Sequence, residues 1–435
     1  MGETQVMNAT DSAVPSSSDQ ITKKVFARLI PLLLLCYFIA YLDRINVGFA
    51  KLQMLADLQF SETVYGLGAG IFFIGYVIFE VPANLILMRI GARVWITMIL
   101  VAFGVISSMT IFVQSATSFY ILRLLLGIAE AGFIPAVLYY LTLWFPSAQR
   151  GKASALFLAG IPLSGAIGAP LSGWIMNQFA GVMGMSGWKW VFLLEGSPAI
   201  ILGLICYYYL DNDIDSAKWL NSQEKAQLKK TLDFETTGKS HSIRDGLTNP
   251  RVWLLSGTYF FLTMGLYGIS FWLPSIIRET GVADPLNVGL LTSIPYIFAL
   301  GAMYLVGLSS DKRKERRWHL AGCALMGAIG LTVSVFFAHN TVIALAALTV
   351  AAMGIIPCVP QFYTLVPAIA SGAAAAMAIA VANSVGSISG FIAPYLIGFV
   401  KDTTGNTTYG VMTLAVALVI GAALVFANPA KLVNR

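Results

Sequence analysis

Long apolar runs separated by short polar segments constrain this chain more than any other feature of its sequence. A helix needs about 20 apolar residues to cross the hydrocarbon core of a bilayer. About twelve runs of this length lie near residues 27–50, 64–88, 93–114, 117–144, 152–179, 188–210, 251–277, 286–309, 318–338, 342–367, 373–400 and 408–428. Only 11% of the 435 residues are charged, against roughly 25% in an ordinary soluble domain. The sequence therefore predicts an all-α membrane protein with twelve transmembrane helices.

A long polar stretch between residues 211 and 250 divides the apolar runs six and six. It includes a helical-looking segment from Ser222 to Leu232. Two similar halves are typical of transporters. We therefore expect five segments: a disordered terminus (1–22), a six-helix bundle (23–210), a linker (211–250), a second six-helix bundle (251–430) and a short tail (431–435).

Basic residues are concentrated in alternate polar segments. They fall at 89–93, 150–152, 218–251, 312–317 and 431–435, whereas the intervening segments hold few. By the positive-inside rule, this asymmetry places both termini in the cytoplasm. The net charge of +6 thus serves as a topology signal, and we expect no nucleic-acid partner. The partner of most of the surface is the lipid bilayer.

Among the charged residues inside the apolar runs, four are the main candidates for function: Asp43, Arg44, Arg123 and Glu130. Charges are costly in hydrocarbon and rarely remain there without a partner or a task. Arg123 and Glu130 are seven residues apart, about two helical turns, and therefore share one helix face. This arrangement favours a protein that moves a charged substrate. The sequence has no pattern of metal ligands, cofactor loop or catalytic nucleophile, so we expect neither a metal nor a cofactor, and no enzyme.

Several segments together resemble the major facilitator superfamily and, within it, the anion:cation symporter family. The resemblance extends from about residue 23 to residue 430. It is carried by Leu42 to Ala50 (LDRINVGFA), Tyr76 to Asn84 (YVIFEVPAN), Arg89 to Arg93 (RIGAR), Arg123 to Gly127, Glu130 to Phe133, Ser310 to Lys312 and Pro394 to Thr404.

The resemblance implies two six-helix bundles around a central cavity and proton-coupled symport of an organic anion. Sugar acids, hydroxy-dicarboxylates and aromatic acids are the substrates of such carriers, which include tartrate, rhamnonate and hydroxyphenylacetate carriers. Sugar-acid carriers hold Gln, Asn and Trp near the positions of Ile161, Ser387 and Tyr363. These departures favour a smaller or more apolar carboxylate. We expect a monomer in the bacterial inner membrane.

Arg44 is our first candidate for binding the substrate, because a guanidinium matches a carboxylate with two parallel hydrogen bonds. Its neighbour Asp43 points about 100° away around the helix. Four further candidates for substrate binding are polar side chains in other runs: Tyr41, Tyr76, Asn383 and Ser387. The alternative for each of them is packing or hydrogen bonding between helices.

Asp43 and Glu130 are the candidate proton carriers. Asp43 lies about 15 residues, roughly 22 Å, beyond Arg28 at the cytoplasmic start of its helix. Arg123 lies about 9 Å below the outer end of its own helix. In a hydrocarbon core about 30 Å thick, the two depths nearly coincide. We therefore expect Asp43 and Arg123 to interact. Glu130 has no basic neighbour in the sequence, so we expect burial alone to keep it protonated. A static ion pair and a neutral, backbone-bonded Glu are the alternatives.

The resemblance also implies that loop charges form an inner gate: Arg89, Arg93, Asp311 and Arg316. Met88 stands where the superfamily usually has an aspartate, so we expect the gate to depend more on Asp311. The alternative role of these charges is topology alone. Glu80 and Glu195 are interpreted mainly as gate or packing residues.

Two other functions remain open. Gly165 to Gly173 approaches the Gly-Pro signature of antiporters, which favours a proton-coupled exporter of drugs or metabolites. A membrane receptor of the same fold that transports nothing would need no proton site. Silent substitutions at Asp43 and Glu130 would favour that receptor.

Overall fold

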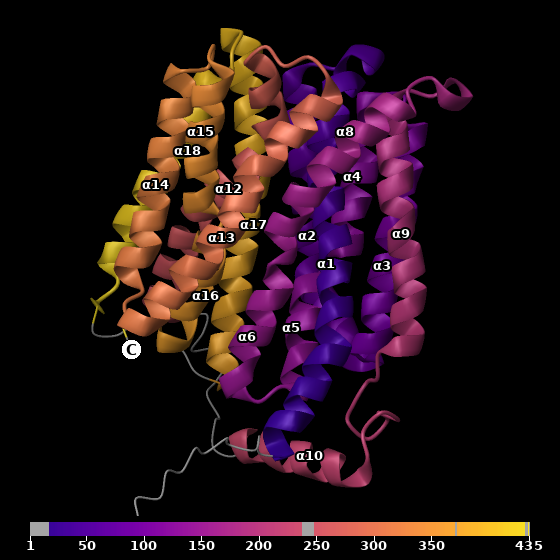
Figure 1. Cartoon of the computed structure of the whole chain (residues 1–435), viewed down its shortest axis with the longest axis vertical. Helices are drawn as coiled ribbons and strands as arrows, with labels where there is room; N and C mark the ends of the chain where they lie inside the picture. The colour runs from indigo at the N-terminus through magenta and orange to yellow at the C-terminus, as the bar shows by residue number, and fades with distance from the viewer. Residues whose placement is uncertain (1–16, 237–247, 370–371, 431–433, 435) are drawn as a thin grey trace, which may run out of the picture.

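The computed structural model describes residues 17–236, 248–369, 372–430 and 434. Within these ranges the regular elements are helices, and twelve helical spans are long and apolar enough to cross a membrane. The helices of the first half gather on one side of the molecule and those of the second half on the other (Figure 1). The predicted fold of two six-helix bundles is confirmed.

The N-terminal bundle contains six spans, of which the fourth and fifth are built from shorter pieces. Its elements are α1 (Ser17–Leu58), α2 (Glu62–Ile90), α3 (Ala92–Met109), η1 (Thr110–Phe112), α4 (Ala116–Glu130), α5 (Phe133–Trp144), α6 (Ser147–Leu158), α7 (Gly160–Leu163), the π-helical η2 (Ser164–Gly168), α8 (Ala169–Gln178), η3 (Val182–Gly184) and α9 (Gly187–Tyr209).

The linker helix α10 (Ser222–Thr236) follows, and the C-terminal bundle comes after it. Its elements are α12 (Pro250–Glu279), α13 (Pro285–Arg313), α14 (Arg317–Phe336), α15 (Thr341–Ile355), α16 (Cys358–Ile369), α17 (Gly372–Thr404) and α18 (Thr408–Ala427).

The boundaries of the N-terminal segment and of the linker can be compared with the expected ones only in part. Helix α1 already begins at Ser17, so residues 17–22, which we expected to be disordered, form its first turns. The expected linker helix is present and extends to Thr236. Residues 1–16, 237–247 and most of the tail after residue 430 lie outside the described part of the chain.

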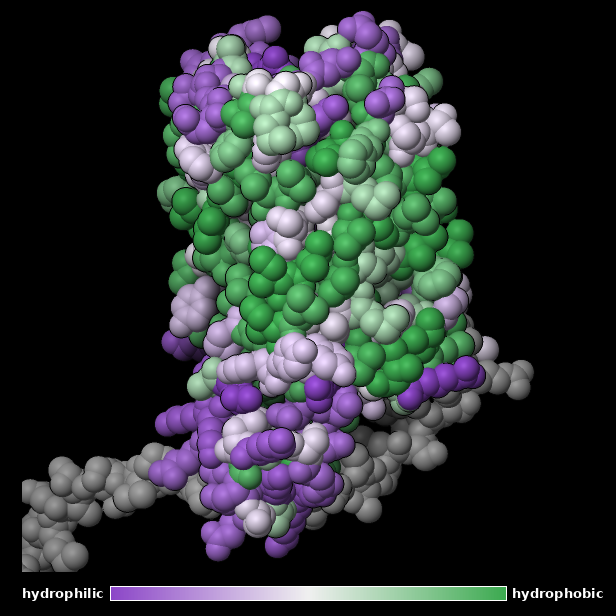
Figure 2. Space-filling model, turned by 90° about the vertical axis from the view of Figure 1, so that its right-hand side faces the viewer, coloured by the Kyte–Doolittle hydropathy of each residue, from purple (hydrophilic) through white to green (hydrophobic). Residues whose placement is uncertain are grey.

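Apolar side chains cover the middle of the outer surface. Large exposed hydrophobic residues occur on most spans, among them Ile78, Leu85, Ile201 and Tyr304. Figure 2 shows this surface as a broad hydrophobic band with hydrophilic residues above and below it. In water such a continuous band would be a liability, whereas in lipid it is the expected outer surface of a membrane protein.

The end of the molecule that carries α10 is called the α10 end here, and the opposite end is called the far end (Figure 1). Near the far end α2 and α17 touch through their backbones. A Cβ atom at Gly66 would overlap the carbonyl oxygen of Pro394, and one at Gly398 would overlap that of Glu62. Only glycine allows two helices to approach this closely.

The same arrangement recurs on the opposite side, between α8 and α13. A Cβ at Gly173 would overlap the carbonyl oxygen of Pro285, and one at Gly289 would overlap that of Ala169. In both places the helix that begins at the far end has its glycine four residues after its first residue. The two bundles are thus joined at the far end by two equivalent seams, α2–α17 and α8–α13.

A polar contact reinforces each seam. At the first, the Asp402 carboxylate of α17 accepts hydrogen bonds from the backbone N–H groups of Glu62 (3.1 Å) and Thr63 (2.8 Å) at the start of α2. At the second, the Asn177 amide of α8 donates to Asp284 (2.6 Å), the N-cap of α13. Each bundle therefore helps to cap a helix of the other.

Candidate functional site

Arg44 and Glu130 form a buried ion pair within the N-terminal bundle. Nε and one terminal nitrogen of Arg44 each lie 2.8 Å from Glu130 Oε2. The two residues are 5% and 0% exposed. The Arg44 guanidinium carbon also lies 5.2 Å from the ring centres of both Phe72 and Tyr76. The expectation that burial alone acts on Glu130 is wrong, because the long Arg44 side chain reaches it from another helix.

The backbone places Glu130 at a helix break. Helix α4 ends at Glu130, Ala131 is extended, and Gly132 has φ +82°, a conformation that suits glycine. A Cβ at Gly132 would also overlap the side chain of Ala83. A carboxylate at the C-terminal end of a helix is disfavoured by the helix dipole. The guanidinium of Arg44 offsets that disadvantage.

Asp43 faces a different set of neighbours. Its Oδ1 accepts hydrogen bonds from Ser107 of α3 and from Asn46 (3.4 Å), and the residue is fully buried. Arg123 interacts with it electrostatically, but the described contacts of the Arg123 side chain include no ion pair with Asp43. Arg123 Nε instead donates to the Gly68 carbonyl oxygen at 3.4 Å.

Glu195 belongs to the same polar region as Asp43. It is 1% exposed, accepts a 2.6 Å hydrogen bond from Ser172, and interacts electrostatically with Asp43. Sequence reasoning treated Glu195 as structural. Its position inside an apolar run is the signal that could have marked it as a candidate.

Glu80 joins the two bundles near the middle of the molecule. Its two carboxylate oxygens accept hydrogen bonds from Asn383 (2.6 Å) and Ser384 (2.7 Å) of α17. Asn383 in turn accepts a hydrogen bond from the Tyr363 hydroxyl at 3.4 Å. The Tyr259 hydroxyl donates to the Tyr363 hydroxyl at 3.3 Å. The predicted C-terminal-half residue Asn383 is therefore in the centre, but its amide binds Glu80. Neither Ser384 nor Tyr259 was singled out, because hydroxyl groups in apolar runs are common.

Three other expected substrate-binding residues are also buried near the centre. The Tyr41 hydroxyl lies 3.1 Å from Ser270 of α12, on the other bundle. Tyr76 is 2% exposed and approaches Asn383, but its hydroxyl has no hydrogen bond of good geometry within the described residues. Ser387 contacts Tyr267, a residue that sequence reasoning did not single out.

The expected gate residues lie at the α10 end without a described contact between the bundles. Arg93 Nε donates to the Tyr207 carbonyl oxygen at 2.6 Å, inside the N-terminal bundle. Arg316 donates to the Thr364 carbonyl oxygen inside the C-terminal bundle. Arg89 and Asp311 are exposed. A gate formed by these four residues remains a prediction.

Among the described residues, no group of three His, Cys, Asp or Glu side chains is placed so that it could hold a metal ion. The central polar groups are carboxylates, the guanidinium groups of Arg44 and Arg123, hydroxyls and amides. Such groups can bind an anion and exchange protons without a cofactor.

Comparison with known proteins identifies the family. Residues 33–394 match the model of the Major Facilitator Superfamily. The chain belongs to this superfamily. It is therefore a multi-pass membrane transporter and does not belong to a family of enzymes.

Similar transporters of the superfamily include bacterial proteins that align with nearly the whole chain. A putative metabolite transport protein NicT of Pseudomonas putida is 49% identical, over 99% of this chain and 100% of its own. A putative tartrate transporter of Agrobacterium vitis is 45% identical, over 93% of this chain and 90% of its own. A quinolone resistance transporter of Acinetobacter baumannii is 39% identical, over 95% of each chain.

A solved structure has the same fold as this transporter. It is a bacterial homologue of the human lysosomal transporter Spinster, with a TM-score of 0.74 and 18% sequence identity. The match covers 94% of this chain and 96% of that one.

Proposed function

We propose that this transporter is a proton-coupled symporter that imports a small organic carboxylate by alternating access. We place it in the bacterial inner membrane with the α10 end in the cytoplasm, in accordance with the distribution of basic residues. The observation that carries the proposal is the buried Arg44–Glu130 ion pair. The names of two relatives, a metabolite transport protein and a tartrate transporter, support an organic anion as substrate.

The buried pair couples the proton to the anion through charge balance. With Glu130 ionised and bound to Arg44, the pair is neutral. If a proton neutralises Glu130, Arg44 is free to bind the substrate carboxylate, and the site is again neutral. A proton alone or an anion alone would leave one net charge buried, which is costly. Proton and carboxylate therefore enter and leave this site together.

The remaining central groups complete the substrate site in this proposal. The Tyr76 ring lies beside the guanidinium and its hydroxyl approaches Asn383, and Tyr41 and Ser387 contribute hydroxyls near the junction of the bundles. Asn383 becomes available when its hydrogen bond to Glu80 breaks. This small set of polar groups among aromatic rings fits a compact or aromatic carboxylate better than a polyhydroxy acid.

Two carboxylate variants test the coupling. Purified transporter is first screened for thermal stabilisation by tartrate and benzoate at pH 5.5 and 7.5, since a bound ligand stabilises by mass action. Uptake of the better ligand is then measured in proteoliposomes with an acidic exterior. Glu130→Gln keeps Arg44 available for the carboxylate but cannot release a proton. We expect it to exchange substrate across the membrane yet to lose accumulation driven by the pH gradient.

Asp43→Asn should likewise lose accumulation and retain exchange, because Asp43 is the second proposed proton carrier. Asp215→Asn is the matched control, since it removes an exposed carboxylate outside the spans and should accumulate substrate like the wild type. Accumulation at the wild-type level in Glu130→Gln would refute the proposal.

The second candidate function is proton-coupled export, which is favoured by the similarity to the quinolone resistance transporter. The direction of the driving gradient separates the two functions. A symporter accumulates its substrate in vesicles when the exterior is acidic, and an antiporter does so when the interior is acidic. A substrate without a negative charge would also favour export.

A further inference from the structure

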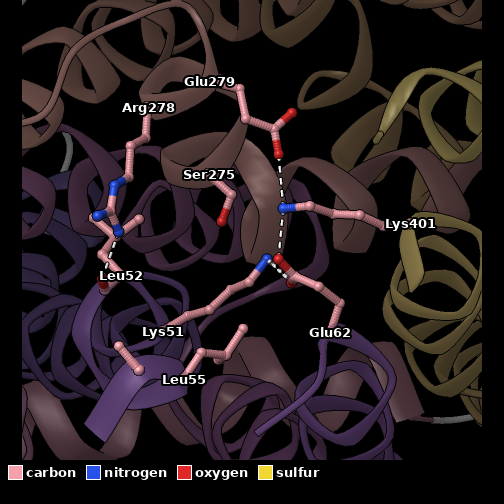
Figure 3. Close-up of a pocket in the computed structure, with 9 residues that line it drawn as sticks. Lys51, Leu52, Leu55, Glu62, Ser275, Arg278, Glu279 and Lys401 are labelled. Atoms are coloured by element: carbon pink, nitrogen blue, oxygen red, sulfur yellow. Dashed lines mark hydrogen bonds and ion pairs between the residues drawn. The ribbon is translucent and has the colours of Figure 1, made fainter. Parts of the chain in front are cut away.

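A polar pocket of about 410 Å³ lies at the far end, between the two bundles (Figure 3). Helices α1 and α2 contribute Lys51 and Glu62, and α12 contributes Arg278 and Glu279. The fifth charged residue is Lys401 of α17. Lys51 lies seven residues after Arg44 on the same helix, about two turns or roughly 10 Å further toward the far end. The pocket is therefore separate from the central site.

The basic side chains of this pocket are not all paired with acidic ones. Lys401 Nζ lies 2.5 Å from Glu62 and 2.8 Å from Glu279, and Lys51 Nζ lies 2.6 Å from Glu62. The two carboxylates are thus bound by the two lysines. The described contact of the Arg278 guanidinium is to a neutral acceptor, the carbonyl oxygen of Leu52. Among the residues that line the pocket, Arg278 is thus the basic side chain without an acidic partner.

A buried hydroxyl marks the binding position. Ser275 is 5% exposed, lines the pocket, and its Oγ has no hydrogen-bond partner among the described residues. In Figure 3 its side chain points into the space between Arg278 and Lys401. A buried hydroxyl without a partner is costly, so it indicates that a ligand or water completes the site.

We propose that this pocket binds the carboxylate of a small organic monoanion, held by Arg278 and Ser275. A carboxylate would supply the acidic partner that Arg278 lacks, and the guanidinium has further N–H donors that can bind it. Leu52 and Leu55 supply apolar walls for the organic part of the ligand. The site goes beyond the proposed transport function, since it lies away from the central polar residues and needs no proton.

The test uses full-length transporter in detergent, with Arg44→Gln and Glu130→Gln combined, which removes the central carboxylate site without leaving a buried unpaired charge. Binding of 4-fluorobenzoate is measured by fluorine NMR titration. We expect a saturable bound signal that persists in this background. The neutral analogue 4-fluorobenzamide should not bind, and an excess of chloride should not displace the carboxylate.

Two pocket variants then locate the signal. Adding Arg278→Gln should weaken binding at least tenfold, because it removes the positive charge that lacks an acidic partner. Adding Ser275→Ala should weaken binding several-fold; this change removes no ion pair and so keeps the test valid if Arg278→Gln misfolds. Lys189→Gln is the control, since it removes another cation at the far end that does not line the pocket.

Three results would overturn the proposal. They are the absence of a saturable signal in this double-variant background, a signal that neither pocket variant weakens, and displacement by an excess of chloride. The last result would mean that the pocket is a site for inorganic anions. Because Arg44 is absent throughout, none of these results bears on the transport function.

Discussion

Arg44 and its neighbour Asp43 illustrate how one residue step separates two environments. The Arg44 side chain contacts Glu130, Phe72 and Tyr76, whereas Asp43 contacts Ser107 on α3. Residues adjacent on a helix point about 100° apart. A buried charge at either position therefore acts on its own surroundings. We propose that the first environment binds substrate and the second holds a proton.

A double-mutant cycle tests whether Arg44 and Glu130 are a coupled pair. Arg44→Gln leaves the Glu130 carboxylate buried without a counter-charge, which should cost about 3–5 kcal/mol of stability at neutral pH. Arg44→Gln combined with Glu130→Gln removes both charges and should recover most of this loss. Thermal unfolding of the wild type, the two single variants and the double variant in one detergent measures the coupling. Additive effects of the two changes would contradict the pairing.

The charged residues of the site could be found from the sequence, but their partners could not. Asp43, Arg44, Arg123 and Glu130 stand out because each interrupts an apolar run. The choice of Arg44 rather than Arg123 as the partner of Glu130 depends on which side chain reaches across from another helix. Sequence spacing gives the depth of a residue along its helix, but it does not show which side chain of another helix reaches it.

At the scale of helices, the start of α14 has an acidic cap just outside the membrane-spanning segments. Glu315 accepts hydrogen bonds from the backbone N–H groups of Trp318 and His319, from the His319 ring and from Asn434. Burial raises the pKa of the Glu315 carboxyl, but these hydrogen bonds hold it below its ordinary value. The ionised carboxylate thus stabilises the beginning of the helix.

The sign of this pKa shift predicts a dependence on pH. A lowered pKa in the folded state contributes stability above the unfolded pKa of about 4.3, and that stability is lost as the pH falls through the folded value. Glu315→Gln should therefore lower the melting temperature at pH 7. The difference from the wild type should shrink steadily as the pH falls below about 4. A difference that grows on acidification would contradict the assignment.

The helices themselves were largely predictable, and their interruptions were not. Apolar length located eleven of the twelve spans within about four residues, whereas the first, expected at 27–50, extends from Gln20 to Leu58. The break after Glu130 requires Gly132 at positive φ, and the π-helical turn at Ser164–Gly168 requires a local change of hydrogen bonding. Both features depend on close contacts with other helices, Gly132 with Ala83 and Gly165 with Tyr296.

At the scale of the whole molecule, the far end is closed by the glycine contacts of the two seams. The sequence shows small residues recurring in the fifth and eleventh spans, including Gly173 and Gly398, a pattern that indicates close helix packing. It could not show that their partners lie in the other bundle. That pairing depends on how the two halves face each other.

A bulky residue in a seam should hold the far end open. We expect Gly289→Val to clash with the Ala169 carbonyl oxygen and to increase the labelling of Ser270→Cys by a water-soluble maleimide at least several-fold. Ser270 is buried in the present structure. The four native cysteines are replaced by alanine for this measurement.

Gly301→Val, on the same helix, is the matched control, because a Cβ at Gly301 meets no atom within 4 Å. Its labelling should equal that of the parent protein. Equal labelling of Gly289→Val and Gly301→Val would show that the α8–α13 seam does not limit opening.

The shared helix caps give the seams an energetic consequence for the transport cycle. When the bundles separate at the far end, Asp402 leaves the first N–H groups of α2, and a lost cap costs about 0.5–2 kcal/mol. Each 1.4 kcal/mol changes an equilibrium tenfold. Substitutions at Asp402 or Asn177 would therefore change the fraction of substrate-free transporters that are open at the far end. Evolution could adjust the apparent affinity for substrate in this way without changing any residue that contacts the substrate.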